Sequence, residues 1–206
     1  MYIIDKEYFI KEYFIPNLNE FNNPIIKELE LYIESTVRDF LLELLGVDDY
    51  NELNTFVIGG VVNSTLPDKW KWFFRGKEYV NSSGNKVIWQ GLIYEQGQAK
   101  ISLLAPYVCF KIFYDKQTQF TNVGEKVINS INGTNANPYK RAVFCWNSFL
   151  DMYQGNLLYL DNYFPCFGNN IINNVRVSLL EFLNDHKTVF TSVNLKYYQK
   201  ENQLGI

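Results

Sequence analysis

Residues that could perform acid, base or nucleophilic chemistry are sparse in this chain. Its 206 residues include one histidine, His186, and three cysteines, Cys109, Cys145 and Cys166. A single histidine cannot form a histidine-rich metal site, and widely spaced cysteines without a C-x-x-C pair do not form a zinc or redox motif. Cys109 and Cys145 lie inside apolar runs, where a reduced cysteine acts as a small buried side chain. We therefore expect no metal and no cofactor.

The remaining candidate groups also have simpler explanations than catalysis. His186 follows an expected short helix, where a cation is favourable at the carboxyl end of the helix. A cysteine–histidine nucleophile pair would need a third, orienting group, and no local motif provides one. Phosphate-binding glycine loops and a G-x-S-x-G elbow are absent from the sequence. Carboxylates cluster at Asp48, Asp49 and Glu52, but Asp48 after Gly46 is best explained as a helix cap. The sequence thus indicates a protein that is not an enzyme, with no catalytic residues.

Tryptophan and basic residues alternate in one short segment, around Trp70, Trp72 and Trp89. Aromatic rings interleaved with cations could stack bases and hold phosphates, so a nucleic-acid-binding module using this Trp-rich hairpin is the alternative function. The formal net charge of −3 argues against a chain that grips many phosphates. The other interpretation is that the tryptophans pack this segment onto the core while the lysines face water.

Charge and hydropathy patterns give further expectations. Acidic and basic residues are interpreted as mixed along the chain, without an acidic tail. The N-terminal segment is interrupted by charges and lacks the apolar core of a signal peptide, and no apolar stretch approaches the ~20 residues that would span a bilayer. We expect a product that is made in the cytoplasm and does not enter a membrane.

The clearest secondary-structure signal is a helix that begins at Asn23-Pro24 and ends at Gly46. Asparagine before proline is typical of a helix start, and glycine is typical of the position after a helix. Apolar residues recur between them at intervals of three and four, as in Ile33, Val37 and Phe40. This spacing predicts an amphipathic helix with one face in the core.

The other predicted elements follow from turn and cap residues. A short helical turn starts at Pro67-Asp68, and a helix starts at Asn137-Pro138 and ends before Gly155. Ser178 and Glu181 form a capping box that opens a short helix through Asn184. The remaining predictions are a β-hairpin of strands 77–80 and 86–93, a helix over 101–119 with Pro106 in its first turn, a polar loop over 121–137 and an extended tail over 188–198. Residues 54–66 and 156–173 are left unassigned.

These elements predict a mainly α fold, a bundle of about four to five helices with an inserted β-hairpin and extended terminal arms. We expect one domain over residues 1–206. It consists of an N-terminal arm (1–22), a helical core (23–155) with the hairpin near 77–93, and a C-terminal helix and extended tail (156–206).

Aromatic residues make up 17% of the chain and suggest contacts with other subunits. The arm carries more apolar surface than a free terminus usually exposes, and a two-stranded hairpin is marginal in water unless its face is covered. We expect both to contact neighbouring subunits. The predicted interface residues are Tyr8, Phe9, Tyr13, Phe14, Trp72, Tyr79 and Trp89.

Three stretches together resemble a known family. The first, ELELYIESTVRDFLLELLGVDDYNEL, is a helix with a leucine-glycine end and a short aromatic turn. The second, residues 69–125, contains a tryptophan turn, a G-x-x-Y hairpin, a W-x-G-L strand end and an aromatic helix, and the third, RAVFCWNSFLDMY, is a helix with a Trp-Asn pair. Their order and spacing are similar to those of the head–tail connector (adaptor, or head-completion) proteins of tailed bacteriophages, in the form found in phages of Bacteroidetes hosts, including crAss-like phages.

The resemblance spans roughly residues 25–155, while the N-terminal arm and the segment after Gly155 depart from the family pattern. It implies a structural virion protein at the head–tail junction, assembled in the host bacterial cytoplasm. About twelve copies would close into a ring in the neck, between the portal protein and the tail or a further neck ring. Genomic DNA would pass through the lumen without specific binding.

Overall fold

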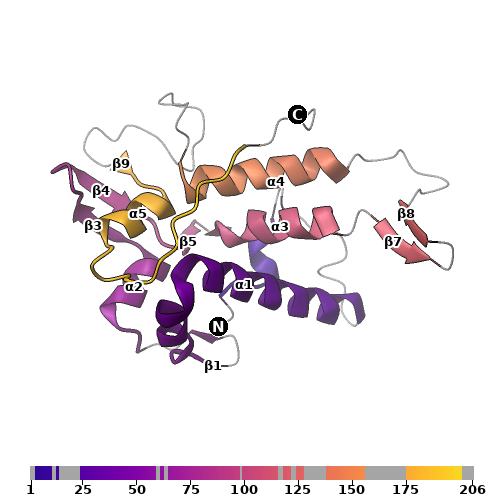
Figure 1. Cartoon of the computed structure of the whole chain (residues 1–206), viewed down its shortest axis with the longest axis horizontal. Helices are drawn as coiled ribbons and strands as arrows, with labels where there is room; N and C mark the ends of the chain where they lie inside the picture. The colour runs from indigo at the N-terminus through magenta and orange to yellow at the C-terminus, as the bar shows by residue number, and fades with distance from the viewer. Residues whose placement is uncertain are drawn as a thin grey trace.

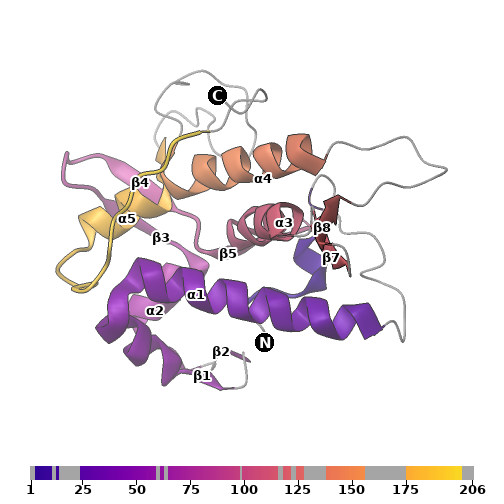
Figure 2. The ribbon, with the colours of Figure 1, turned by 45° about the vertical axis from the view of Figure 1, so that its right-hand side comes forward.

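Three long helices form the body of the molecule in three layers. The computed structural model describes residues 3–10, 13, 24–58, 61–62, 65–97, 99–115, 118–121, 124–127, 138–155 and 175–200. Figures 1 and 2 both show α1 (Pro24–Asn54), α3 (Leu104–Asp115) and α4 (Pro138–Tyr153) stacked in that order, with α3 in the middle. Two shorter helices, α2 (Asp68–Arg75) and α5 (Leu179–Asp185), and a 3-10 turn, η1 (Lys6–Tyr8), complete the helical part.

Short strands form small sheets beside these helices. β3 (Lys77–Val80) and β4 (Lys86–Trp89) make an antiparallel hairpin, and β9 (Val175–Arg176) joins β4 in parallel. The other pairs are β1 (Val57–Ile58) with β2 (Val61–Val62), β5 (Ile93–Gln96) with β6 (Ala99–Ser102), and β7 (Thr118–Thr121) with β8 (Gly124–Val127). The predicted mainly α fold with an inserted β-hairpin is confirmed.

Helix α1 continues past the predicted end at Gly46. Gly46 breaks the helical conformation with φ 72° and ψ 175°, and the chain then resumes a helix to Asn54. A Cβ added at Gly46 would lie 2.3 Å from the backbone oxygen of Ser192, so the site excludes any side chain on steric grounds as well. The glycine was correctly predicted as an interruption, but the turn expected after it is helical.

The region after the first hairpin differs from the prediction. The helix expected over 101–119 is α3, which begins at Leu104 and ends at Asp115, with Pro106 in its first turn as expected. Residues 99–102 pair instead with 93–96 to form a second hairpin around Gly97, whose φ of 64° suits a tight turn. Strand β7 begins within the predicted helix and β8 lies within the predicted polar loop. Neither strand was predicted, because a four-residue strand of mixed polarity shows no clear period. Residues 128–137 lie outside the described residues.

The C-terminal elements agree with their local signals. The Ser178 side chain accepts a hydrogen bond from the Glu181 backbone N–H at 3.3 Å, as the capping box predicts, and His186 is the C-cap of α5. Beyond α5, residues 187–200 have no regular secondary structure, in agreement with the extended tail. Figure 1 shows this segment running from the end of α5, past α1, to α4. We call residues 187–200 the strap.

Most of the predicted core positions are buried. They include Ile33, Val37, Phe40, Leu41 and Leu44 of α1 and Ala142, Val143, Phe149, Leu150 and Tyr153 of α4. One hydrophobic cluster runs from Ile4 in the N-terminal segment to Phe190 after α5. The two terminal segments therefore take part in the same core as the helices.

Candidate interaction surfaces

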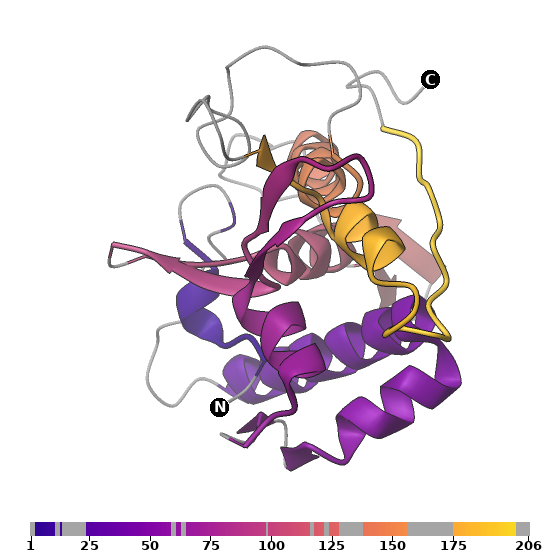
Figure 3. The same ribbon diagram turned by 90° about the vertical axis from the view of Figure 1, so that its left-hand side faces the viewer.

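The β3–β4 hairpin is covered by a helix of its own chain. Trp89 is 2% exposed, its ring stacks on Phe182 of α5 at 5.4 Å between centroids, and its Nε1–H donates to the Phe73 carbonyl at 3.2 Å. The Tyr79 hydroxyl donates to Asp185 at 2.9 Å. Figure 3 shows α5 lying beside this hairpin. The aromatic face that we expected a neighbour to cover is thus covered within the subunit.

The tryptophans of the proposed base-stacking platform are largely occupied by intramolecular contacts. Trp70 is fully buried, and its Nε1–H donates to Glu52 at 3.0 Å. Trp72 is half-buried, with the Lys77 ammonium 3.4 Å from its ring centroid. Because Trp70 and Trp89 lie inside the fold and one face of Trp72 holds a cation, these rings form no open stacking surface.

The described part of the N-terminal arm packs on the same subunit. Tyr8 and Phe9 are buried in the hydrophobic core. Lys100 of β6 forms ion pairs with Asp5, at 3.4 Å, and with Glu7. These contacts attach η1 to the β5–β6 hairpin, so this segment is part of the folded body.

The structure corrects three of the seven predicted interface residues. Tyr8, Phe9 and Trp89 are buried by their own chain, and a buried side chain offers no surface to a neighbour. Tyr13, Trp72 and Tyr79 are half-buried and stay predictions. Phe14 lies outside the described residues.

The carboxylate cluster after Gly46 fastens the strap and α2 to α1. Asp49 is 3% exposed and accepts hydrogen bonds from the Ser192 backbone N–H at 2.8 Å and from Lys69 Nζ at 2.5 Å. The Ser192 hydroxyl lies 2.6 Å from the Leu45 carbonyl, and Glu52 accepts from Lys69 at 2.7 Å. These polar groups satisfy one another, so the cluster has a structural role.

The ion pairs also set the charge of Lys69. Burial acts to lower the pKa of Lys69, but its hydrogen bonds to Asp49 and Glu52 outweigh burial, and the pKa is raised above its usual value. Lys69 therefore stays protonated, and its single positive charge is shared between the two carboxylates. Sequence reasoning assigned the cap to Asp48 and did not find the partnership of Asp49 with Ser192, which lies 143 residues away.

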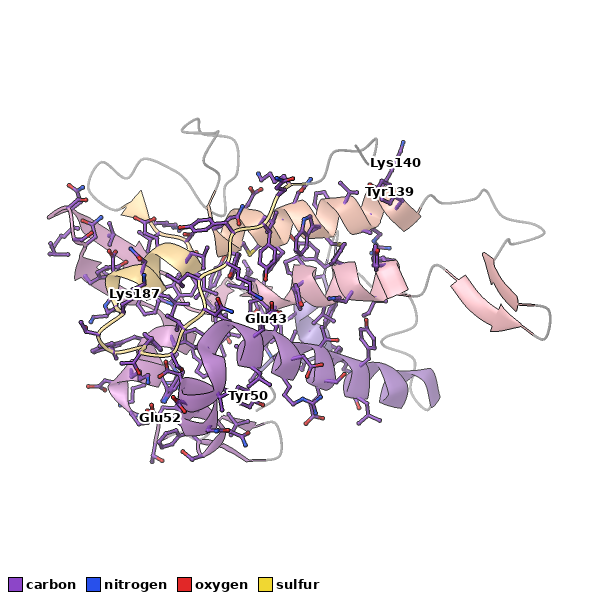
Figure 4. All side chains as sticks on the ribbon, viewed as in Figure 1. Glu43, Tyr50, Glu52, Tyr139, Lys140 and Lys187 are labelled. Carbon is purple, nitrogen blue, oxygen red and sulfur yellow. The ribbon has the colours of Figure 1, made fainter. Side chains whose placement is uncertain are left out.

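The strap makes a series of polar contacts along the body. The Asn194 backbone N–H donates to the Leu44 carbonyl at 2.8 Å, and Lys196 pairs with Glu43 at 2.6 Å. Further along, the Tyr198 backbone and the Gln154 amide exchange two hydrogen bonds of 2.9 and 2.8 Å. Figure 4 shows Glu43 on the side of α1 where the strap passes. The strap thus links the two outer layers, α1 and α4.

Cys109, Cys145 and His186 lie in the interior of the fold. Cys109 and Cys145 are buried and free, as predicted, and a hydrogen bond to Cys145 together with burial raises the pKa of Cys109 above its usual range. The His186 Nδ1 lies 2.9 Å from the Phe182 carbonyl, which can only accept, so this nitrogen is the donor. Cys166 lies outside the described residues. Among the residues placed by the structure, no three His, Cys, Asp or Glu side chains are grouped to hold a metal ion.

Charge is segregated in the fold, contrary to the even mixing inferred from the sequence. Helix α1 contains eight acidic and two basic residues, against 22 and 19 in the whole chain. The helix therefore has a formal charge of −6, and the remainder of the chain has +3. One outer layer of the three is strongly acidic, while the rest of the molecule is weakly basic.

No helix within the described ranges is both long enough and apolar enough to cross a bilayer. Compared with models of protein families, with curated proteins and with solved structures, the chain gives no match.

Proposed function

We propose that this chain is a structural subunit of a tailed-phage neck, which assembles with copies of itself into a ring between the portal protein and the tail. The ring would contain about twelve copies, by resemblance to the connector family, and would prolong the channel through which DNA passes. The sequence resemblance over residues 25–155 supports this proposal. The described side chains that could do chemistry, Asp49, Glu52 and His186, are engaged in contacts that hold the fold together.

The β7–β8 hairpin is the observation that carries the assembly role. Within the part of the chain that the structure describes, its strands pair with each other and with no other strand, and Figure 1 shows the hairpin beyond the carboxyl end of α3, away from the other labelled elements. An isolated two-stranded hairpin is marginally stable in water and needs a covering surface. A neighbouring subunit or the portal would supply that surface, since a ring offers each projecting element a partner.

Native mass measurement of the full chain tests this proposal. We expect a closed oligomer of one defined size, formed by the chain alone or after addition of the portal protein, and its mass unchanged by single-stranded DNA. A chain that stays monomeric under both conditions would contradict the proposal. A monomer that binds DNA at low salt and loses it steeply with added salt would support the nucleic-acid alternative instead.

A further inference from the structure

We infer that the outward face of α1 in one subunit docks on the outward face of α4 in the next copy; this inference rests on the proposed ring. The two helices form opposite outer layers of the fold, with α3 between them (Figures 1 and 2). A ring built by one repeated contact requires two different patches on each subunit that complement each other. Their charges and exposed apolar side chains meet this requirement.

The first patch, called the α1 face, is acidic with an apolar centre. Positions 31, 34, 38 and 42 align on one side of a helix with 3.6 residues per turn. Leu31 is 59% exposed and Leu42 is 40% exposed, which is high for leucine on the side of a helix. Between them lie the exposed Glu34 and an Arg38–Asp39 ion pair of 3.0 Å, which is neutral overall. The helix as a whole is acidic: Lys69 and Lys196, which pair with its carboxylates from other elements, offset two of its six net negative charges.

The second patch, called the α4 face, is basic and aromatic. Positions 140, 144, 147 and 151 share one side of α4, where Phe144 is 41% exposed and Lys140 is exposed. Figure 4 shows Lys140 near the beginning of α4, pointing away from the helical layers. Asp151, the only acidic residue of α4, is neutralised by an ion pair with Lys200 of the strap. Lys140 is therefore the one basic residue among these four positions, and the one acidic residue, Asp151, is compensated by the strap.

Charge decides which partner fits. Two α1 faces from a symmetric pair would place two acidic helices together, and like charges in contact are unfavourable. DNA would likewise be repelled by α1. In an α1–α4 contact, Glu34 instead faces a lysine, and the two leucines pack on Phe144. Such a contact has an apolar centre and a charged rim, as specific protein interfaces do. A second copy of the chain is therefore the occupant.

Thiol crosslinking tests the pairing directly. Leu31 and Phe144 are chosen because each lies about two turns from the start of its helix. A chain that carries both Leu31→Cys and Phe144→Cys is treated with a short bis-maleimide. The wild-type chain is the control for crosslinking through the native cysteines. We expect a ladder of dimer, trimer and larger species from the combined variant. A mixture of the two single variants should give dimers and no longer species, because each chain then has one reactive face.

A charge exchange provides the second test. Glu34→Lys and Lys140→Glu should each weaken self-association by about tenfold, and the two changes in one chain should restore it to within about threefold. The matched control is Glu78→Lys, the same chemical change at an exposed position of β3, which should leave self-association unaltered.

The outcomes separate this inference from the proposed function. If the wild-type chain forms rings of defined mass but the combined cysteine variant gives no ladder, or the charge exchange gives no rescue, the α1–α4 pairing is overturned and the connector function stands. If the wild-type chain stays monomeric with the portal protein present and the combined cysteine variant gives no ladder, both are contradicted.

Discussion

Asp49 is the residue on which three separate segments of the chain depend. Its carboxylate, in the second half of α1, binds Lys69 of α2 and Ser192 of the strap. Removing Asp49 would leave the Ser192 backbone N–H without its acceptor and Lys69 with Glu52 alone, and a buried donor without an acceptor is costly. A surface pair of similar appearance, such as Lys71 with Asp68, is exposed to water and contributes little.

We therefore predict that Asp49→Ala lowers the free energy of unfolding by about 3 kcal/mol. Lys71→Ala, the control, should lower it by less than about 0.5 kcal/mol. Urea unfolding followed by circular dichroism measures both. Equal effects of the two substitutions would show that Asp49 is not the anchor of the strap.

Tyr79 links the hairpin to the alkaline stability of the protein. Burial, with a further contribution from the hydrogen bond to Asp185, raises the pKa of Tyr79 above its usual value, and burial raises that of Tyr153 in the same direction. A raised pKa in the folded state means that the folded chain holds its proton more tightly than the unfolded chain. The resulting stability is fully present below the unfolded-state pKa of about 10 and is lost as pH rises above it.

We expect the contribution of these tyrosines to the free energy of unfolding to stay constant between about pH 7 and 9 and to fall above about pH 10. Tyr79→Phe should make the alkaline decline shallower, since the substituted ring has no proton to lose. Urea midpoints at a series of pH values measure the slope. An alkaline slope that Tyr79→Phe leaves unchanged would contradict the role of this hydroxyl.

At the scale of elements, the β3–β4 hairpin belongs to the core of its own subunit. Its inner face carries Trp89 against Phe182, whereas Trp72 on the neighbouring helix α2 is half-buried and covered on one face by Lys77. Deleting a large side chain from a packed core removes many contacts and leaves a cavity. The two tryptophans should therefore respond differently to truncation.

Trp89→Ala is expected to lower the free energy of unfolding by about 3–5 kcal/mol, a fall in melting temperature on the order of 10 °C for a chain of this size. Trp72→Ala should cost less than half as much, because part of its surface already faces water. Thermal melts of the two variants test this. A stable Trp89→Ala protein that fails to assemble would restore the interface role first expected for this residue.

At the scale of the whole molecule, the β7–β8 hairpin has no strand partner outside itself among the described residues. By contrast, η1, the β3–β4 hairpin and the strap contribute side chains to the common core. An element that contributes little to the folded subunit can be removed without unfolding it, and its effect on assembly can then be measured separately.

We predict that replacing residues 118–127 by a short Gly-Ser linker leaves the helical circular dichroism intact and the melting temperature within about 2 °C of wild type. The defined oligomer should be lost or weakened at least tenfold. A linker of the same composition inserted at Gly84, the exposed turn of the β3–β4 hairpin, controls for added flexibility. Unchanged oligomerisation in the deletion variant would remove the main support for the assembly role.

The sequence by itself determined where several helices begin, because caps and periodicity are local. Pro138 and Ser178 mark helix starts, Gly46 marks an interruption, and the spacing of Ile33, Val37 and Phe40 identifies the buried face of α1. The mainly α class follows from such signals. Short strands such as β6 and β7 were not predicted, because a four-residue strand has too few positions to show a period.

Only the tertiary structure decided which surfaces meet. Asp49 and Ser192 are 143 residues apart, and no local pattern joins them. An aromatic residue has the same sequence signature whether it is covered by its own chain or by a neighbour, and for that reason Tyr8, Phe9 and Trp89 were predicted as interface residues although they are core. The opposition of the acidic α1 layer to the α4 layer is likewise a property of the packing, because neither helix encodes its position relative to the other.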